Sequence, residues 1–328
     1  MKPTILITTG DFNGVGPEVS LKAASQPSVR KLCTPVLVGP LNVLEHVARD
    51  LRLRAKLQKA KFPVLGVSGI PVLDVGDGIW GDVEYGKPTK AGGRSAGVAI
   101  ERAVEACLNG SAQAMVTAPT SKEALAMAGY QFPGQTEMVA LLSRSPQVAM
   151  MLVSKSMRIG LVTIHVSLRE ASQTITREKV VEKTAIVHGD LVRRYRIERP
   201  KIALLGLNPH AGEQGLMGSD EKELIGPAIQ DLKARGIDAE GPFPADGFFG
   251  SKGYRRYDAV MAMYHDQGLI PIKMDSFGEA VNFSAGLSII RTSPDHGTAY
   301  DLAGKGKARI TSMLEAIKLA VQFARAAA

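Results

Sequence analysis

The chain has 328 residues, a formal net charge of +8 at pH 7, 45% hydrophobic residues and 22% charged residues. This length predicts two domains or one large α/β unit with a substantial apolar core. A positive charge can favour anionic partners. Aromatic residues make up only 5%, however, and the chain has no nucleic-acid-binding motif. We therefore expect scattered surface charge and no nucleic-acid partner.

The chain contains only two cysteines, Cys33 and Cys107. Two are too few for a disulfide framework, which fits a reducing compartment. The N-terminal residues lack a signal-peptide pattern, and no run of about 18 apolar residues is present. We expect a cytoplasmic protein without a membrane partner.

The first half of the chain alternates short apolar runs with helical patterns. Residues 4–8 are expected to form a strand, followed by a glycine-containing loop and a helix at 18–24. This loop could hold an anion at a helix N-terminus, or it could be a plain turn, because it matches neither GxGxxG nor the P-loop. Further strands are expected at 35–38, 71–75 and 114–116, and helices at 41–51, 95–108 and 138–142.

The second half continues the alternation. Helices are expected at 174–192 and 310–326, and strands at 149–153, 158–165, 201–207, 259–264 and 289–292. Two prolines exclude the extended segment 241–246 from a central strand. Such alternation predicts a largely parallel α/β architecture.

Three of the six histidines follow apolar runs: His165, His210 and His265. Ligands of open α/β sheets bind outside the carboxyl ends of the strands. Three imidazoles converging there would form a catalytic metal site. Taken singly, each could also be an ordinary loop histidine.

Five motifs carry a resemblance to a known family. The chain resembles the 4-hydroxythreonine-4-phosphate dehydrogenases, the PdxA family, at GDFNGVGPE (10–18), PGQTE (133–137), LNPHAGE (207–213), YHDQGL (264–269) and RTSPDHGTA (291–299). The segment DHGTAYDLAGKG (295–306) is similar to the cofactor loop of isocitrate and isopropylmalate dehydrogenases, whose fold this family shares.

The resemblance implies a fold of two α/β/α domains flanking a cleft, without a Rossmann domain. Residues 1–133 and 298–328 would form the first domain, and residues 134–297 the second, which would carry the metal and dimer contacts. The active site would be shared across a homodimer interface.

The resemblance also assigns the site residues. Three histidines would bind a divalent metal: His165, His210 and His265. The substrate-binding residues would be Gln135, Thr136, Lys273, Asn282 and Arg291. Asp246 and Lys273 would be catalytic, with Asp246 as the first candidate for the general base, although an activated hydroxyl could make a strong base unnecessary. The cofactor would contact His296, Gly297, Gly304 and Gly306. Asp266 could orient a metal-binding imidazole or cap the following turn.

The implied reaction is metal-dependent oxidation of 4-phosphooxy-L-threonine by NAD or NADP. The resulting 3-oxo acid would decarboxylate to 3-amino-2-oxopropyl phosphate in pyridoxal 5′-phosphate (vitamin B6) biosynthesis. Imidazole ligands favour zinc, with magnesium, manganese or cobalt as alternatives.

One residue departs from the family pattern, because Gln135 stands where the family usually has histidine. A glutamine can exchange hydrogen bonds but cannot carry a positive charge. Related dehydrogenases act on threonate or erythronate 4-phosphate or on aromatic cis-dihydrodiols, so these substrates are alternatives. A zinc hydrolase or lyase without a dinucleotide is an alternative of another class, against which the 295–306 loop argues.

Overall fold

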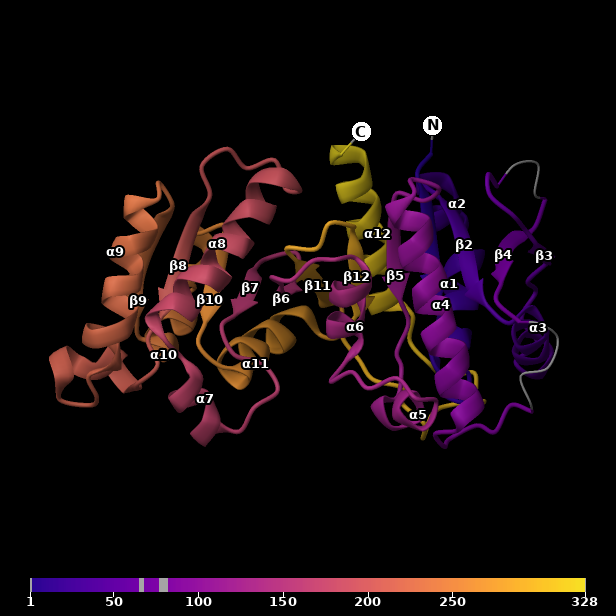
Figure 1. The fold of residues 1–328 in the computed structure, drawn as a ribbon, viewed down its shortest axis with the longest axis horizontal. Coiled ribbons are helices and arrows are strands. Elements are labelled where there is room, and N and C mark those ends of the chain that lie inside the picture. Colours follow the sequence, from indigo (N-terminus) through magenta and orange to yellow (C-terminus); the bar gives the residue numbers. More distant parts are fainter. Residues whose placement is uncertain (1, 65–67, 77–81, 328) are drawn as a thin grey trace. The chain divides into compact units, whose positions relative to one another are not determined.

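The computed structural model describes residues 2–64, 68–76 and 82–327, which fold into two compact units (Figure 1). Unit 1 contains Met1–Pro146 and Leu287–Ala326, and unit 2 contains Gln147–Gly286. The unit boundaries therefore differ from the expected division at 133/134 and 297/298. The difference arises because 135–142 form a helix and 291–294 a strand that both pack within unit 1.

Unit 1 is built on parallel strands in the order β3-β4-β2-β1-β5-β12. Its strands are β1 (Thr4–Thr8), β2 (Thr34–Gly39), β3 (Leu57–Lys59), β4 (Ile70–Asp74), β5 (Ala114–Thr117) and β12 (Arg291–Pro294). Ile5, Leu6 and Ile7 follow one another in β1 and are all fully buried. Because successive side chains point to opposite faces, both faces of this strand are covered.

Two groups of helices accompany these strands. Helices α1 (Gly16–Ser25), α2 (Pro27–Leu32) and α12 (Thr311–Ala326) contact one another, and α1 also contacts α3 (Leu41–Asp50). The second group is α4 (Lys90–Leu108), which contacts both α5 (Lys122–Met127) and α6 (Gln135–Leu142). Helix α12 packs on β12 and β5, so the end of the chain completes the unit that the N-terminus begins.

Unit 2 has the strand order β11-β6-β7-β10-β8-β9, in which β6 is antiparallel to both of its neighbours and the other pairs are parallel. The strands are β6 (Ala149–Val153), β7 (Arg158–Leu161), β8 (Lys201–Leu205), β9 (Asp238–Phe243), β10 (Ala259–Ala262) and β11 (Val281–Ala285). The helical segments are α7 (Leu168–Thr174), α8 (Arg177–Arg193), η1 (Pro209–Gly215), η2 (Glu221–Ile225), α9 (Gly226–Ala234), α10 (Ala245–Gly250), η3 (Gly253–Arg256) and α11 (His265–Ser276).

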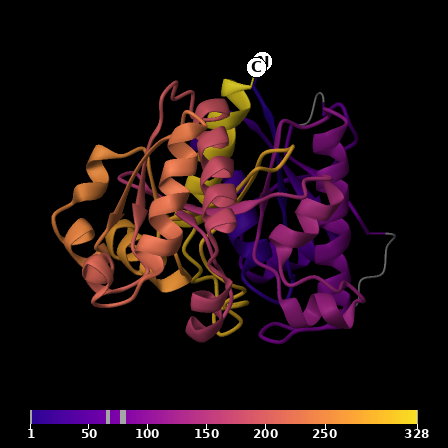
Figure 2. The ribbon, with the colours of Figure 1, turned by 60° about the vertical axis from the view of Figure 1, so that its left-hand side comes forward.

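Strand β7 separates two helices of unit 2. A Cβ on Gly160 would meet the side chain of Val187 in α8. A Cβ on Gly268 of α11 would instead meet Ile159 and Leu161, the neighbours of Gly160 in β7. Since side chains alternate along a strand, α8 and α11 cover opposite faces of β7. Helix α9 packs beside α8 (Figure 1, Figure 2).

Most expected elements are present, with different ends. The helix expected at 174–192 is α8, which starts three residues later because Thr176 caps it by accepting a hydrogen bond from the Lys179 N–H. The strands expected at 158–165, 201–207 and 259–264 end earlier, at Leu161, Leu205 and Ala262, and His265 begins α11. The proline-containing segment 241–246 was kept out of a central strand correctly, since residues 241–243 belong to the outermost strand β9. No described helix is long and apolar enough to cross a membrane.

Helix packing gives a test of unit 1. A Cβ on Gly93 of α4 would lie 1.8 Å from the Ala124 carbonyl oxygen in α5. We expect Gly93→Ala to lower the free energy of unfolding by about 1–3 kcal/mol, as overpacking does. Gly189 of α8 has nothing within 4 Å of its Cβ position, so Gly189→Ala should raise that free energy by about 0.4–1 kcal/mol. Urea denaturation measures both, and effects of the same sign would contradict the packing argument.

Candidate functional site

His165 and His265 lie next to each other in unit 2. Their strands β7 and β10 pair in parallel, and the pairing continues beyond the strands, where the Val162 N–H donates to the Ala262 carbonyl (2.9 Å). The centroids of the two imidazole rings are 5.7 Å apart. Two imidazoles on one zinc, with Zn–N distances of about 2.0–2.1 Å and tetrahedral angles, have centroids roughly 5 Å apart. The spacing therefore fits two ligands of one metal ion.

Asp266 contacts the neighbouring imidazole. Its Oδ1 lies 2.6 Å from Nδ1 of His265, and no side-chain hydrogen bond caps the start of α11. Of the two roles considered from the sequence, the geometry favours orientation of the imidazole. A carboxylate on Nδ1 leaves Nε2 as the ligand atom and fixes the tautomer.

Gln267 joins the ends of two adjacent strands. Its Oε1 accepts a hydrogen bond from the Met263 N–H (2.7 Å), and its Nε2 donates to the Gly206 carbonyl (2.6 Å). The side chain thereby links the segment after β10 to the segment after β8, which leads to His210. Sequence reasoning gave Gln267 no role, although it lies within the YHDQGL motif.

His210 lies in a segment with an unusual backbone. Residues 210–214 all have positive φ, including His210 at 51°. This backbone conformation is uncommon for residues other than glycine. The carboxylate of Glu221 holds the preceding residues, because it accepts hydrogen bonds from the N–H groups of Leu207 (2.8 Å) and Asn208 (2.7 Å). Asp220, which precedes η2, makes no cap hydrogen bond, and the buried Glu221 is the residue that positions this loop.

The structure brings two of the three histidines together within one chain. Among residues 2–64, 68–76 and 82–327, no group of three or more His, Cys, Asp or Glu side chains is arranged to hold a metal ion. His165 and His265 are neighbours, and His210 does not join them in such a group.

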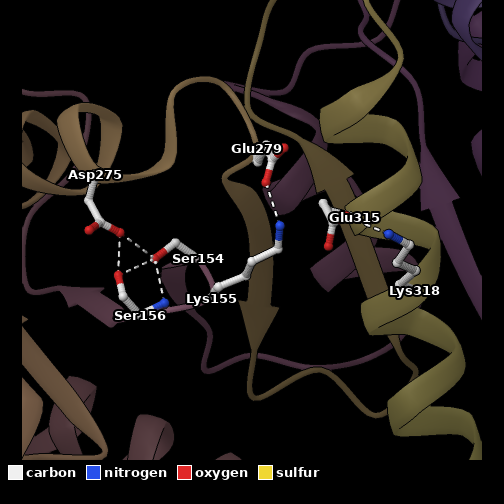
Figure 3. Close-up of polar contacts among 7 residues, drawn as sticks. All are labelled: Ser154, Lys155, Ser156, Asp275, Glu279, Glu315 and Lys318. Carbon is white, nitrogen blue, oxygen red and sulfur yellow. Dashed lines mark hydrogen bonds and ion pairs between the residues drawn. The ribbon is translucent and has the colours of Figure 1, made fainter.

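Helix α11 also carries Lys273, which is exposed. The end of this helix is attached to the turn between β6 and β7, where Asp275 accepts hydrogen bonds from the hydroxyls of Ser154 and Ser156 (Figure 3). Just beyond the helix, Lys155 of the same turn pairs with Glu279 at 2.8 Å. These contacts hold the end of the helix that bears Lys273.

Two further candidates of unit 2 differ in environment. Asp246 is exposed in the first turn of α10. Asn282 in β11 has a buried Oδ1 with no hydrogen-bond partner in the described part of the chain. A buried acceptor of this kind is costly to leave unsatisfied, so a donor from a ligand fits this position.

Arg291 is the central charged group of unit 1 and is only 2% exposed. Its guanidinium donates to Oγ1 of Thr117 from Nε (3.0 Å) and Nη2 (2.7 Å), and from Nη1 to Oγ1 of Thr136 (3.2 Å). Nη2 also donates to Oε1 of Gln135 (3.3 Å). Burial lowers the pKa of Arg291 to about 10, an effect that Glu137 opposes, so the side chain stays charged at neutral pH. A buried cation with uncharged oxygens among its partners suits recognition of an anionic group.

Both the oxygen and the nitrogen of the Gln135 side-chain amide make hydrogen bonds. It accepts from Arg291 and donates from Nε2 to the Ala118 carbonyl at 3.2 Å. Thr117, which accepts two hydrogen bonds from Arg291, was not predicted as a site residue. The only sequence signal was its position at the end of a strand.

The expected cofactor segment is an open loop. His296 and Gly297 are exposed, and a Cβ on Gly297 would meet nothing within 4 Å. Gly304 and Gly306 have φ values of 73° and 67°, so they turn the chain in a conformation that favours glycine. An exposed backbone with free space above Gly297 permits close approach of a ligand.

Comparison with known proteins relates the whole chain to one family of enzymes. The family described as pyridoxal phosphate biosynthetic protein PdxA matches residues 31–320. The chain is 44% identical over 332 residues to 4-hydroxythreonine-4-phosphate dehydrogenase of Geobacter metallireducens, covering 99% of this chain and 96% of the relative. It is 42% identical to D-threonate 4-phosphate dehydrogenase of Cupriavidus necator, covering 98% and 97%. The solved 4-hydroxythreonine-4-phosphate dehydrogenase of Klebsiella pneumoniae aligns with a TM-score of 0.89 at 36% identity, covering 99% and 98%, which confirms the expected fold class.

The contacts of Arg291 predict an energetic asymmetry between two buried threonines. Thr117→Val removes the oxygen that accepts two charged hydrogen bonds, so we expect the free energy of unfolding to fall by about 1.5–3 kcal/mol. In Thr184→Val the lost bond is a neutral one to the Val180 carbonyl of the same helix (2.7 Å). That control should cost about 1 kcal/mol or less. Equal losses in urea denaturation would argue against a special role for Thr117.

Proposed function

The chain belongs to the PdxA family of pyridoxal phosphate biosynthetic proteins, and from this premise we propose that it oxidises 4-phosphooxy-L-threonine. The secondary alcohol at C3 is oxidised to a ketone as NAD or NADP is reduced. The 3-oxo acid then loses carbon dioxide and gives 3-amino-2-oxopropyl phosphate for pyridoxal 5′-phosphate biosynthesis. The observation that carries the proposal is the neighbouring His165–His265 pair in a chain similar over 99% of its length to a relative of that name.

The metal ligands are assigned to His165, His210 and His265. Imidazoles favour zinc, and magnesium, manganese or cobalt are the alternatives. A bound divalent metal supplies Lewis-acid polarisation of the substrate oxygens. Asp266 keeps the His265 ring in the orientation that exposes Nε2, which is its contribution to binding.

We assign the substrate's anionic groups to charged and polar side chains. Arg291, with Thr136 and Gln135 beside it, presents a guanidinium fork that matches phosphate or carboxylate oxygens. Lys273 provides a second, exposed cation. Asn282 offers its buried Oδ1 to a substrate N–H or O–H group. Asp246 and Lys273 are the proposed proton-transfer residues, with Asp246 accepting the proton of the hydroxyl.

The dinucleotide is assigned to the loop that contains His296, Gly297, Gly304 and Gly306. A bound nicotinamide supplies the hydride acceptor. The loop also exposes Lys305 and Lys307, whose charges suit the phosphates of a dinucleotide.

A second copy of the chain is the proposed partner. Seven large apolar side chains of unit 2 are exposed in or beside the segments that carry the three histidines: Val166, Leu168, Leu216, Met217, Ile270, Met274 and Phe277. Contiguous exposed apolar side chains mark interaction surfaces, and we propose that these seven line the dimer interface. One chain's described residues contain no three-ligand group, which supports a site in which His210 and His265 come from different subunits. We propose the cytoplasm as its location, in keeping with the free thiols of Cys33 and Cys107.

A second candidate substrate is D-threonate 4-phosphate. The relative from Cupriavidus necator that bears this substrate in its name is 42% identical. The two substrates differ at C2, where 4-phosphooxy-L-threonine carries an amino group and D-threonate 4-phosphate carries a hydroxyl group. Gln135 is neutral and can donate or accept a hydrogen bond, so it accommodates either.

The function is tested with chelator-stripped protein, each nicotinamide cofactor and each of the two substrates. We expect no reduction of NAD or NADP without metal and restored reduction when zinc, magnesium, manganese or cobalt is added, measured by absorbance of the reduced nicotinamide. Mass spectrometry should find the decarboxylated product. Turnover of threonate 4-phosphate alone would select the second candidate. Absence of reduction with every combination would overturn the dehydrogenase assignment and favour a zinc hydrolase or lyase.

The shared metal site is tested by mixing two inactive variants. His210→Ala and His265→Ala should each abolish turnover without unfolding the protein, as circular dichroism would show. If the two ligands come from different subunits, a refolded mixture forms heterodimers with one intact site and regains about a quarter of the wild-type activity. A mixture as inactive as its components would contradict the shared site, and near-normal activity of His210→Ala alone would contradict the ligand assignment.

A further inference from the structure

Glu18 and Lys22 of α1 hold one end of the 295–308 loop. Glu18 is 2% exposed, and its Oε1 accepts a hydrogen bond from the Ala308 N–H at 3.0 Å. The same oxygen lies 2.5 Å from Nζ of Lys22. Nζ of Lys22 in turn donates to the Gly306 carbonyl at 2.8 Å. One ion pair thus fixes the backbone at two positions of a segment almost the whole chain length away.

The residues before α1 hold the other end of the same loop. The Val15 N–H donates to the Thr298 carbonyl at 2.9 Å, and a Cβ on Gly14 would lie 2.8 Å from that oxygen. The Tyr300 hydroxyl donates to Oδ2 of Asp11 at 2.6 Å. The glycine-containing segment 10–18 therefore lies directly against the loop at Thr298 and Tyr300.

These contacts favour one of the two interpretations of the 10–18 segment, the plain turn. An anion site at the start of α1 would need backbone N–H groups directed at a ligand. The Val15 N–H is used by Thr298, and a Cβ on Gly16 would lie 2.3 Å from the Thr9 carbonyl oxygen. The chain itself occupies these positions, which favours a supporting role of the segment for the loop.

We propose that Glu18 and Lys22 are positioning residues for the dinucleotide, acting through the backbone at Gly306 and Ala308. The inference rests on the proposed function, which assigns the loop to NAD or NADP. Ordering a free loop on binding opposes affinity, and a loop ordered beforehand avoids that loss. The ion pair of Lys22 and Glu18 orders the loop before the cofactor arrives. Breaking it should weaken cofactor binding while leaving the substrate contacts intact.

The variant Lys22→Met tests the inference. The Lys22 side chain is partly buried, 22% exposed, and its partner Glu18 is buried, so circular dichroism must first show that the variant is folded. Lys318→Met is the control for loss of a lysine ion pair, since Lys318 pairs with Glu315 at 2.6 Å within α12 (Figure 3). We expect Lys22→Met to raise the Kd of NAD or NADP by up to about tenfold, because the cofactor must then order a loop that has lost one charged hydrogen bond within the protein. Quenching of bound reduced nicotinamide fluorescence measures Kd directly.

Three further readouts separate positioning from general destabilisation. The KM of the cofactor should rise in parallel with Kd, while the KM of the substrate and kcat at saturating cofactor stay unchanged. Hydrogen exchange at residues 306–308 should accelerate in the unliganded protein. Lys22→Arg should restore much of the cofactor affinity, because it keeps the charge and donors, and Lys318→Met should leave all of these values unchanged.

Two negative outcomes have different meanings. If the unmodified protein binds NAD or NADP and Lys22→Met binds it equally well, the positioning role is overturned and the proposed function stands. Equal increases in the cofactor and substrate KM values, or the same effect in Lys318→Met, would also overturn it. If the unmodified protein binds neither dinucleotide, the proposed function is overturned together with this inference.

Discussion

The parallel pairing of β7 with β10 is the interaction on which the unit 2 site depends. The pairing brings the segments after both strands together, and the bond from the Val162 N–H to the Ala262 carbonyl extends it towards His165 and His265. The imidazoles are therefore positioned by backbone hydrogen bonds, with a ring separation of 5.7 Å. Gln267 links this pair of strands to the segment after β8 by donating a hydrogen bond to the Gly206 carbonyl. If both imidazoles bind one ion, as proposed, this framework limits the reorganisation that binding requires.

In unit 1 the main constraint is the burial of the positive charge of Arg291. A buried guanidinium is tolerated only when polar groups compensate for its lost hydration. Thr117 at the end of β5 and Thr136 at the start of α6 supply oxygens to Arg291. Gln135 adds a third oxygen while its amide nitrogen holds the Ala118 carbonyl. A positively charged histidine at position 135 would repel Arg291, so the neutral glutamine is compatible with the buried charge.

Local sequence patterns predicted the buried strands well and the site supports poorly. Apolar runs such as 4–8 and 149–153 form the expected strands, because burial on both faces requires continuous apolar sequence. The helix that starts at His265 was missed because it contains a glycine and Pro271, which disfavour a helix locally and are overruled by packing on β7 and β10. Glu221 and Thr117 act across 14 and 174 residues. No local pattern encodes contacts at such separations.

The same limit explains why the 10–18 motif was ambiguous in the sequence. Glycines in a strand-to-helix loop suggest close approach to something, and the pattern does not say to what. In the structure the approach is to the chain itself: a Cβ on Gly10 would lie 2.2 Å from the Pro119 carbonyl oxygen, and one on Gly14 would lie 2.8 Å from that of Thr298. The N-terminal motif and the 295–306 loop are thus two halves of one packing arrangement. A larger residue at Gly14 would have to displace the backbone at Thr298.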